Sequence, residues 1–173
     1  MHRQIGTEYR HHGLPEVAVS DSASPSIRTG RSVSHLRVLI ADDHPQMLAA
    51  MVHVVESDSR FLVVGTATNG HDALQVAIDS EVDIALLDVR MPGGGPAAVA
   101  AFVALPSPPV VVAVSAETSL STVAAMVGAG AVGYLAKGRI GESLPEVLAQ
   151  CAAGEVVLAT GSGAGALRML LGN

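Results

Sequence analysis

The sequence contains a short apolar segment, residues 82–89, that ends at a carboxylate and is followed within a few positions by the turn Pro92-Gly93. Apolar residues at nearly every position predict a strand that is covered on both faces, as in a parallel sheet. Asp88 would then lie at the carboxyl end of this strand, which is the edge where open α/β sheets bind ligands. An aspartate before a Pro-Gly turn can also simply begin that turn, so its interpretation depends on the other strands.

Apolar segments of this kind alternate with segments of helical periodicity along most of the chain. The expected strands are 36–41, 61–65, 82–88, 110–114 and 131–136. The expected helices are 46–57, 71–80, 97–105, 119–128 and 141–152. Five strand–helix units in succession predict an α/β fold, with a doubly wound, five-stranded parallel sheet and helices on both faces. The expected strand order is 2-1-3-4-5, the flavodoxin-like arrangement, which brings the first and third strands together.

Three regions differ in their patterning. Residues 1–35 lack periodicity and are rich in Ser, Arg, His and Gly, so we expect a flexible leader there. The folded domain is expected to span 36–153. Residues 154–173 are expected to form a linker or C-terminal tail, with a short strand at 156–158 and a last helical turn near 164–171.

The composition favours a packed cytoplasmic domain. Apolar residues make up 49% of the chain, enough for a core, and the net charge of −6 argues against a free-standing nucleic-acid binder. Cys151 is the single cysteine, which excludes an intramolecular disulfide and a cysteine-based zinc site. The first residues contain no apolar signal-peptide core, and the uncharged segment 118–136 contains three glycines, so we expect no membrane span.

Polar side chains follow four of the predicted strands at the points where these strands end. They are Asp42, Asp43, Asp88, Ser115 and Lys137, the last being the single lysine of the chain. A parallel sheet gathers all of them at one edge. Carboxylates about 4–5 Å apart repel by roughly 3–4 kcal/mol a pair at an effective dielectric near 20, so stability gives no reason for such a cluster. A divalent cation that prefers oxygen ligands, such as Mg²⁺, removes this repulsion.

The same residue types suit the transfer of a phosphoryl group. A divalent cation, a lysine ammonium and a hydroxyl all stabilise the negative charge on phosphoryl oxygens. The acceptor would be a carboxylate oxygen, so the product would be an acyl phosphate.

Four motifs together point to a known family. They are Val-Leu-Ile-Ala-Asp-Asp-His at 38–44, Leu-Asp-Val-Arg-Met-Pro-Gly at 87–93, Ser-Ala at 115–116 and Gly-Tyr-Leu-Ala-Lys at 133–137. Through these motifs the chain from Leu36 to about Ala153 resembles the receiver domain of bacterial two-component response regulators, with the LuxR/NarL-type branch most similar. Each motif alone is weak, but the combination is specific because the strand ends agree in residue type and order.

The resemblance implies a phosphoacceptor and a metal site. Asp88 would be the phosphoacceptor. Asp42, Asp43, Asp88 and the backbone carbonyl of Arg90 would hold Mg²⁺, Asp43 directly and Asp42 mainly through water.

The resemblance also implies a switch. Ser115 and Lys137 would hold phosphoryl oxygens. Phosphorylation of Asp88 would draw Ser115 inward and let Tyr134 follow, which would reshape one face of the domain for a partner or a second copy of the chain.

The implied partner is a sensor histidine kinase, and the protein would be modified once rather than act as a multiple-turnover enzyme. A homodimer is a further option, and no membrane partner is expected. Members of this branch carry a helix-turn-helix domain after the receiver, and residues 154–173 are too few to form one. DNA binding is therefore expected only if a C-terminal domain is missing from this chain.

Three other functions stay open. Gly-rich segments at 128–133 and 161–166 match the nucleotide-binding fingerprint by letters, but neither has the required strand–turn–helix context with a strand to follow. A phosphatase with an aspartate nucleophile would place a second acid two residues after the first, a spacing that 42–45 lacks. A phosphorylation-independent, receiver-like interaction module would have the same fold without the chemistry.

Overall fold

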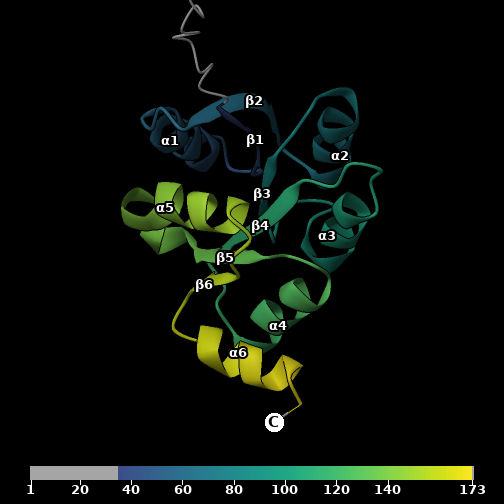
Figure 1. Ribbon diagram of the computed structural model, residues 1–173, viewed down its shortest axis with the longest axis vertical. Helices are drawn as coiled ribbons and strands as arrows, with labels where there is room; N and C mark the ends of the chain where they lie inside the picture. The colour runs from purple at the N-terminus through teal and green to yellow at the C-terminus, as the bar shows by residue number, and fades with distance from the viewer. Residues whose placement is uncertain (1–34, 173) are drawn as a thin grey trace, which may run out of the picture. The chain divides into compact units, whose positions relative to one another are not determined.

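The computed structural model describes residues 35–172, and its strands form one parallel sheet (Figure 1). The strands are β1 (Leu36–Ala41), β2 (Phe61–Ala67), β3 (Ile84–Asp88), β4 (Val110–Ser115), β5 (Gly133–Ala136) and β6 (Val157–Ala159). Their order in the sheet is β2-β1-β3-β4-β5-β6. The predicted α/β fold and the order 2-1-3-4-5 are therefore confirmed. The predicted leader, 1–35, lies outside the described residues except for its last position.

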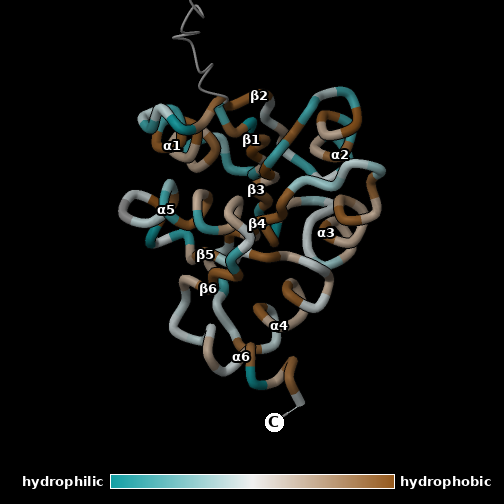
Figure 2. The backbone as a smooth tube through the Cα atoms, in the orientation of Figure 1, coloured by the Kyte–Doolittle hydropathy of each residue, from teal (hydrophilic) through white to brown (hydrophobic). Residues whose placement is uncertain are grey.

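Helices cover both faces of this sheet. They are α1 (Pro45–Glu56), α2 (Gly70–Asp79), α3 (Gly95–Val103), α4 (Leu120–Gly128), α5 (Ile140–Ala152) and α6 (Gly163–Leu170), with a 3₁₀ turn, η1 (Lys137–Arg139), before α5. Helices α1 and α5 pack on one face, and α2, α3 and α4 pack on the other (Figure 1). The central strands are mostly brown in Figure 2, as expected for strands that are buried on both sides.

Strand β3 shows how the apolar segment at 82–89 is used. All five of its residues are buried. Ile84 and Leu86 contribute to the core under α1 and α5, whereas Ala85 and Leu87 contribute to the core under α2, α3 and α4. Because both faces are covered, the only polar residue of this strand, Asp88, lies at its carboxyl end.

Local signals start several helices directly after strand ends. Proline occupies the first turn of α1, where its missing N–H costs no hydrogen bond. The side chain of Asn69 accepts a hydrogen bond from the Asp72 amide at 2.9 Å and caps α2. Ser119 caps α4 by accepting from the Thr122 amide at 3.3 Å. Early helix starts keep the loops above the sheet short, which holds the strand ends in place.

A sixth strand extends the predicted five-stranded sheet. β6 pairs with the outer edge of β5, with Leu158 opposite Tyr134, and α6 then packs against α4. A Cβ atom on Gly163 would lie 2.8 Å from the carbonyl oxygen of Leu158, so glycine permits the close turn between β6 and α6. The predicted tail, 154–173, thus contains a strand and a helix that pack on the domain, and Gly163 and Gly165 serve this packing.

Among residues 35–172, no helix combines the length and the apolar character that a bilayer span needs. The uncharged segment 118–136 is instead divided into α4, a turn and β5. Gly130 in that turn has a φ of 111°, a backbone conformation that side chains other than hydrogen disfavour.

Candidate functional site

Four strand ends meet at one edge of the sheet, as the sequence predicts. Asp42 and Asp43 follow β1, and Asp88 ends β3, the strand next to β1. Ser115 ends β4, and Lys137 directly follows β5. The side chains of Asp42 and Asp88 are 0% and 1% exposed, respectively, so two of the three carboxylates are removed from bulk water.

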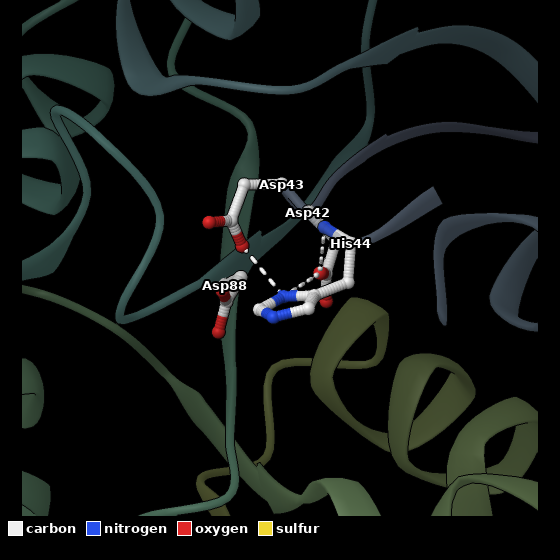
Figure 3. A group of neighbouring side chains, drawn as sticks. All are labelled: Asp42, Asp43, His44 and Asp88. Atoms are coloured by element: carbon white, nitrogen blue, oxygen red, sulfur yellow. Dashed lines mark hydrogen bonds and ion pairs between the residues drawn. The ribbon is translucent and has the colours of Figure 1, made fainter. Parts of the chain in front are cut away.

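The carboxylates form a compact cluster together with one imidazole. One ligand atom from each of Asp42, Asp43, His44 and Asp88 lies within 4.8 Å of all the others. Figure 3 shows these four side chains gathered around a common point. Oxygen donors at this density suit a divalent cation such as Mg²⁺.

The donor atoms themselves test whether a cation fits. Within residues 35–172, the buried atoms Asp42 Oδ2, Asp43 Oδ1 and both Oδ atoms of Asp88 have no hydrogen-bond partner. Three of these four oxygens contact Lys137 Nζ or His44 Nδ1, and among the described residues Asp88 Oδ2 has neither contact. Buried polar atoms are ordinarily satisfied, so this crowded set of carboxylate oxygens indicates a site made for a further positive charge. The residues present therefore fit a magnesium ion.

Lys137 supplies one positive charge at this edge. Its Nζ atom lies 2.6 Å from Asp42 Oδ2 and 3.1 Å from Asp88 Oδ1, and its side chain is 13% exposed. Burial by itself lowers the pKa of this ammonium group, but the contacts with Asp42 and Asp88 outweigh burial and raise it. Lys137 is therefore held in its charged form between the two buried carboxylates.

One ammonium does not fully compensate the acid cluster. The pKa of Asp88 is raised above its ordinary value, mainly because the carboxyl is buried. Lys137 and the backbone amide of Arg90 lower this pKa, whereas the charge of Asp42 raises it. A further positive charge next to Asp88 would lower this pKa and favour the ionised, nucleophilic form.

Ser115 and Tyr134 both form hydrogen bonds with the backbone of Glu117, in the loop after β4. The Ser115 hydroxyl oxygen is buried and accepts a hydrogen bond from the Glu117 amide at 3.0 Å. The Tyr134 hydroxyl donates to the backbone carbonyl of Glu117, and its ring is fully buried in the core beneath α2, α3 and α4. Burial raises the pKa of this phenol. We expected the Tyr134 ring to follow Ser115 inward after phosphorylation. In this structure the ring is already buried in the core.

Arg90 has a contact that the sequence did not reveal. Its guanidinium lies 2.7 Å from Glu117 Oε2, and the arginine side chain is 70% exposed. Thr122 and Ser119 also donate to the Glu117 carboxylate, and these contacts together lower the pKa of Glu117. The side chain of Arg90 therefore links the loop after β3 to the loop after β4, while the role expected of its backbone carbonyl stays a prediction.

Sequence reasoning gave no role to His44, although it follows the two acids directly. Its Nδ1 atom lies 2.8 Å from Asp43 Oδ1 and 3.4 Å from Asp42 Oδ1. The signal that could have revealed it is the uninterrupted order Asp-Asp-His, because three adjacent ligand-type side chains at one strand end form a short chelating segment.

Close backbone packing around the loop after β3 requires glycine at several positions. A Cβ atom on Gly94 would lie 2.8 Å from the carbonyl oxygen of Asp88, and one on Gly70 would collide with the carbonyl of Gly93. Gly93 also has a φ of 68°, which glycine adopts readily. The Gly70 amide donates to the Pro92 carbonyl at 2.8 Å, so the start of α2 fixes this loop beside Asp88.

A parallel sheet of this order, with an acid cluster and a lysine at its carboxyl edge, is the arrangement expected of a phosphoryl-accepting domain. Residues 38–149 match the family described as "Response regulator receiver domain". The chain belongs to this family. Its receivers accept a phosphoryl group rather than turn over a substrate, which separates the chain from nucleotide-binding domains and from phosphatases.

Named relatives agree with the NarL-type resemblance. The chain is 34% identical over 127 residues to the "Uncharacterized transcriptional regulatory protein YxjL" of Bacillus subtilis, a match covering 72% of this chain and 58% of that protein. It is 34% identical over 125 residues to the "Probable transcriptional regulatory protein NarL" of Mycobacterium tuberculosis, with the same shares of both chains. The chain therefore spans somewhat more than half the length of these curated relatives.

A solved structure gives the same result for the fold. The signal receiver domain of the putative response regulator NarL from Mycobacterium tuberculosis superposes with a TM-score of 0.68 at 32% identity. The match covers 70% of this chain and 99% of that domain.

Proposed function

We propose that this protein accepts a phosphoryl group on Asp88 from the phosphohistidine of a sensor histidine kinase. Asp42, Asp43, Asp88 and the backbone carbonyl of Arg90 would hold Mg²⁺, which supplies positive charge to the phosphoryl oxygens when bound. The observation that supports this proposal best is the burial of the Asp88 carboxyl group and the contacts of its two oxygens. Its carboxyl is buried, Lys137 Nζ lies 3.1 Å from Oδ1, and among residues 35–172 Oδ2 has no hydrogen-bond partner.

The transfer is a single displacement. An oxygen of Asp88 forms the new bond to phosphorus, while the bond from phosphorus to the histidine nitrogen of the kinase breaks. The released imidazole then takes a proton from water. Lys137 holds its charge beside the forming acyl phosphate, and the Ser115 hydroxyl, whose O–H can donate while its oxygen accepts from the Glu117 amide, binds a second phosphoryl oxygen.

The output is a change in the loop that follows β4. The Ser115 hydroxyl now accepts from the Glu117 amide, and Tyr134 holds the carbonyl of the same residue. A phosphoryl group that draws Ser115 toward Asp88 would lengthen the contact with the Glu117 amide and alter the start of α4. Rearrangement there would change the surface offered to a partner or to a second copy of the chain.

The names of the relatives describe transcriptional regulatory proteins. For this chain we propose the receiver step alone. DNA binding would depend on a domain of the kind that fills the remaining length of those relatives.

Incubation with acetyl phosphate, followed by mass spectrometry of the intact protein, tests the proposal. We expect the mass of one phosphoryl group to be added in the presence of Mg²⁺ and not in the presence of EDTA. Asp88→Asn should abolish the addition, whereas Asp79→Asn should not, because Asp79 is an exposed residue on α2. A modification that persists in Asp88→Asn would refute the assignment. The absence of any modification would favour a phosphorylation-independent interaction module.

A further inference from the structure

An imidazole lies among the carboxylates of the proposed magnesium site. Figure 3 shows the His44 ring beside Asp43 and Asp42, with Asp88 across from it. The Nδ1 atom is 2.8 Å from Asp43 Oδ1 and 3.4 Å from Asp42 Oδ1. The His44 side chain is 71% exposed, so its ring can turn without disturbing the core.

A nitrogen donor changes which metal ions the site prefers. Mg²⁺ takes oxygen ligands almost exclusively. Zn²⁺ and Mn²⁺ also accept carboxylate oxygen, but Zn²⁺ and the later transition metals bind imidazole strongly. We propose that His44, Asp43 and Asp88, with Asp42, form a site for an imidazole-accepting divalent metal ion that binds in competition with Mg²⁺. This inference shares its carboxylates with the proposed function and assigns His44 as a further ligand.

One of the two distances suits coordination through a small ion. Metal–ligand bonds to imidazole nitrogen and carboxylate oxygen are about 2.0–2.2 Å, which places neighbouring ligands of a tetrahedral ion about 3.3–3.6 Å apart. The 3.4 Å separation of Nδ1 from Asp42 Oδ1 lies in this range, whereas the 2.8 Å separation from Asp43 Oδ1 is that of a direct contact. The exposed ring would therefore turn away from Asp43 to admit the ion.

The backbone holds His44 in position for this role. Its amide donates to Asp42 Oδ1 at 2.9 Å, which closes a tight turn after β1. Pro45 follows immediately and begins α1, so the direction of the chain at His44 is fixed. The side-chain torsions alone remain to be ordered when a metal binds, and this preorganisation favours affinity.

The burial of Asp88 is a second observation in favour of this metal site. An exposed histidine next to an exposed acid would be a weak surface pair. Here Asp88 is 1% exposed, and within residues 35–172 its Oδ2 atom has no hydrogen-bond partner and no ion pair. Lys137 contacts the other oxygen of Asp88 and Oδ2 of Asp42, which leaves Asp88 Oδ2 and the Asp43 carboxylate to face His44 and a cation.

Mn²⁺ serves as a spin probe for the test, with the full chain and two matched variants. His44→Gln removes the proposed ligand, and His53→Gln changes another exposed histidine, on α1. Electron spin echo modulation from a coordinated ¹⁴N nucleus should appear in the wild type and in His53→Gln but not in His44→Gln. Zn²⁺ affinity, measured by competition with a chromophoric chelator, should fall about tenfold or more in His44→Gln. Mg²⁺ affinity should fall less than Zn²⁺ affinity.

Nitrogen modulation that persists in His44→Gln would overturn the inference, because another histidine would then be the ligand. An equal loss of Zn²⁺ and Mg²⁺ affinity would also overturn it, since His44 would then act only by shaping the loop. The proposed function is tested separately by acetyl phosphate with Mg²⁺. A His44-dependent nitrogen signal without phosphorylation of Asp88 would refute that function alone, and phosphorylation without the signal would refute the metal inference alone.

Discussion

The ammonium nitrogen of Lys137 lies 2.6 Å from Oδ2 of Asp42, although the two residues are separated by nearly the whole length of the domain. The same nitrogen is 3.1 Å from Asp88, so one cation serves two buried carboxylates. Two carboxylates and one ammonium leave a net negative charge at the centre of the site. The chain thus retains an electrostatic penalty that a bound cation or phosphoryl-transfer complex can relieve.

Replacing Lys137 with methionine should destabilise the metal-free protein. The substitution keeps most of the side-chain volume but leaves Asp42 and Asp88 buried without a counter-charge, which costs about 3–5 kcal/mol for a buried pair. Urea unfolding in EDTA measures the loss, and Mg²⁺ should recover part of it. Arg139→Met, an exposed change in the same 3₁₀ turn, is the control and should have little effect. An unchanged midpoint in Lys137→Met would show that the ammonium contributes no net stability.

The stability of the metal-free protein should depend on the ionisation of Asp88. Burial raises the pKa of this carboxyl in the folded state above its ordinary value of 3.8. Between the ordinary and the raised pKa the folded protein binds more protons than the unfolded chain, so the free energy of unfolding from this group falls as pH rises. Below both pKa values Asp88 is protonated in both states, so its burial as a charged group costs nothing. Above the raised pKa the full cost of burying the charged carboxylate is present.

Asp88→Asn removes this titration and should therefore become more stable relative to the wild type as pH rises through that window. Urea unfolding of both proteins in EDTA, at several pH values from about 4 upward, gives the comparison. Mg²⁺ should reduce the difference, because the ion stabilises the ionised wild type more than a variant that lacks the Asp88 carboxylate. A difference that stays constant with pH would show that Asp88 is not the group responsible.

The fold and the acid cluster could be predicted because both depend on patterns that are local in the sequence. Apolar strands that alternate with helices require parallel connections, and a parallel sheet brings all its strand ends to one edge. Asp42, Asp88 and Lys137 could therefore be placed together from sequence alone, and the structure confirms that they are in contact.

Features that depend on rotamers and long-range packing could not be predicted. His44 follows the acids in the sequence, but rotation about its side-chain bonds decides whether the ring faces them or the solvent. The period of β5 gives the face on which Tyr134 lies but not the partner of its hydroxyl. The short strand expected at 156–158 is present as β6, but its pairing with β5 and the fit of Gly163 against Leu158 depend on residues that pack only after folding.

Removing the hydroxyl of Tyr134 should loosen the loop after β4. Tyr134→Phe keeps the buried ring but deletes the hydrogen bond to the Glu117 carbonyl, which should lower the free energy of unfolding by about 0.5–1.5 kcal/mol. Amide hydrogen exchange should accelerate at 116–119 more than in the central strands. Tyr134→Leu is the comparison, because it also removes ring packing and should cost more. Unchanged exchange in the loop of Tyr134→Phe would show that the contact does not hold it.

A side chain at Gly133 should destabilise the protein, because Cys151 of α5 packs closely against this strand position. A Cβ atom at this position would lie 2.8 Å from the sulfur of Cys151 and 2.9 Å from a methyl carbon of Val112, two buried side chains in a close-packed core. Gly133→Ala should therefore cost about 1–3 kcal/mol through overpacking. Gly141→Ala is the matched control, since a Cβ atom there meets nothing within 4 Å on the exposed start of α5. That control should gain about 0.5–1 kcal/mol from helix propensity.

The double variant Gly133→Ala/Cys151→Ala separates overpacking from a backbone effect. Replacing the sulfur with hydrogen opens space for the new methyl group, so the double variant should lose less stability than the sum of the two single variants. Urea unfolding of all four proteins measures this coupling. Strict additivity would mean that the cost of Gly133→Ala arises from the strand backbone or from Val112 rather than from contact with α5.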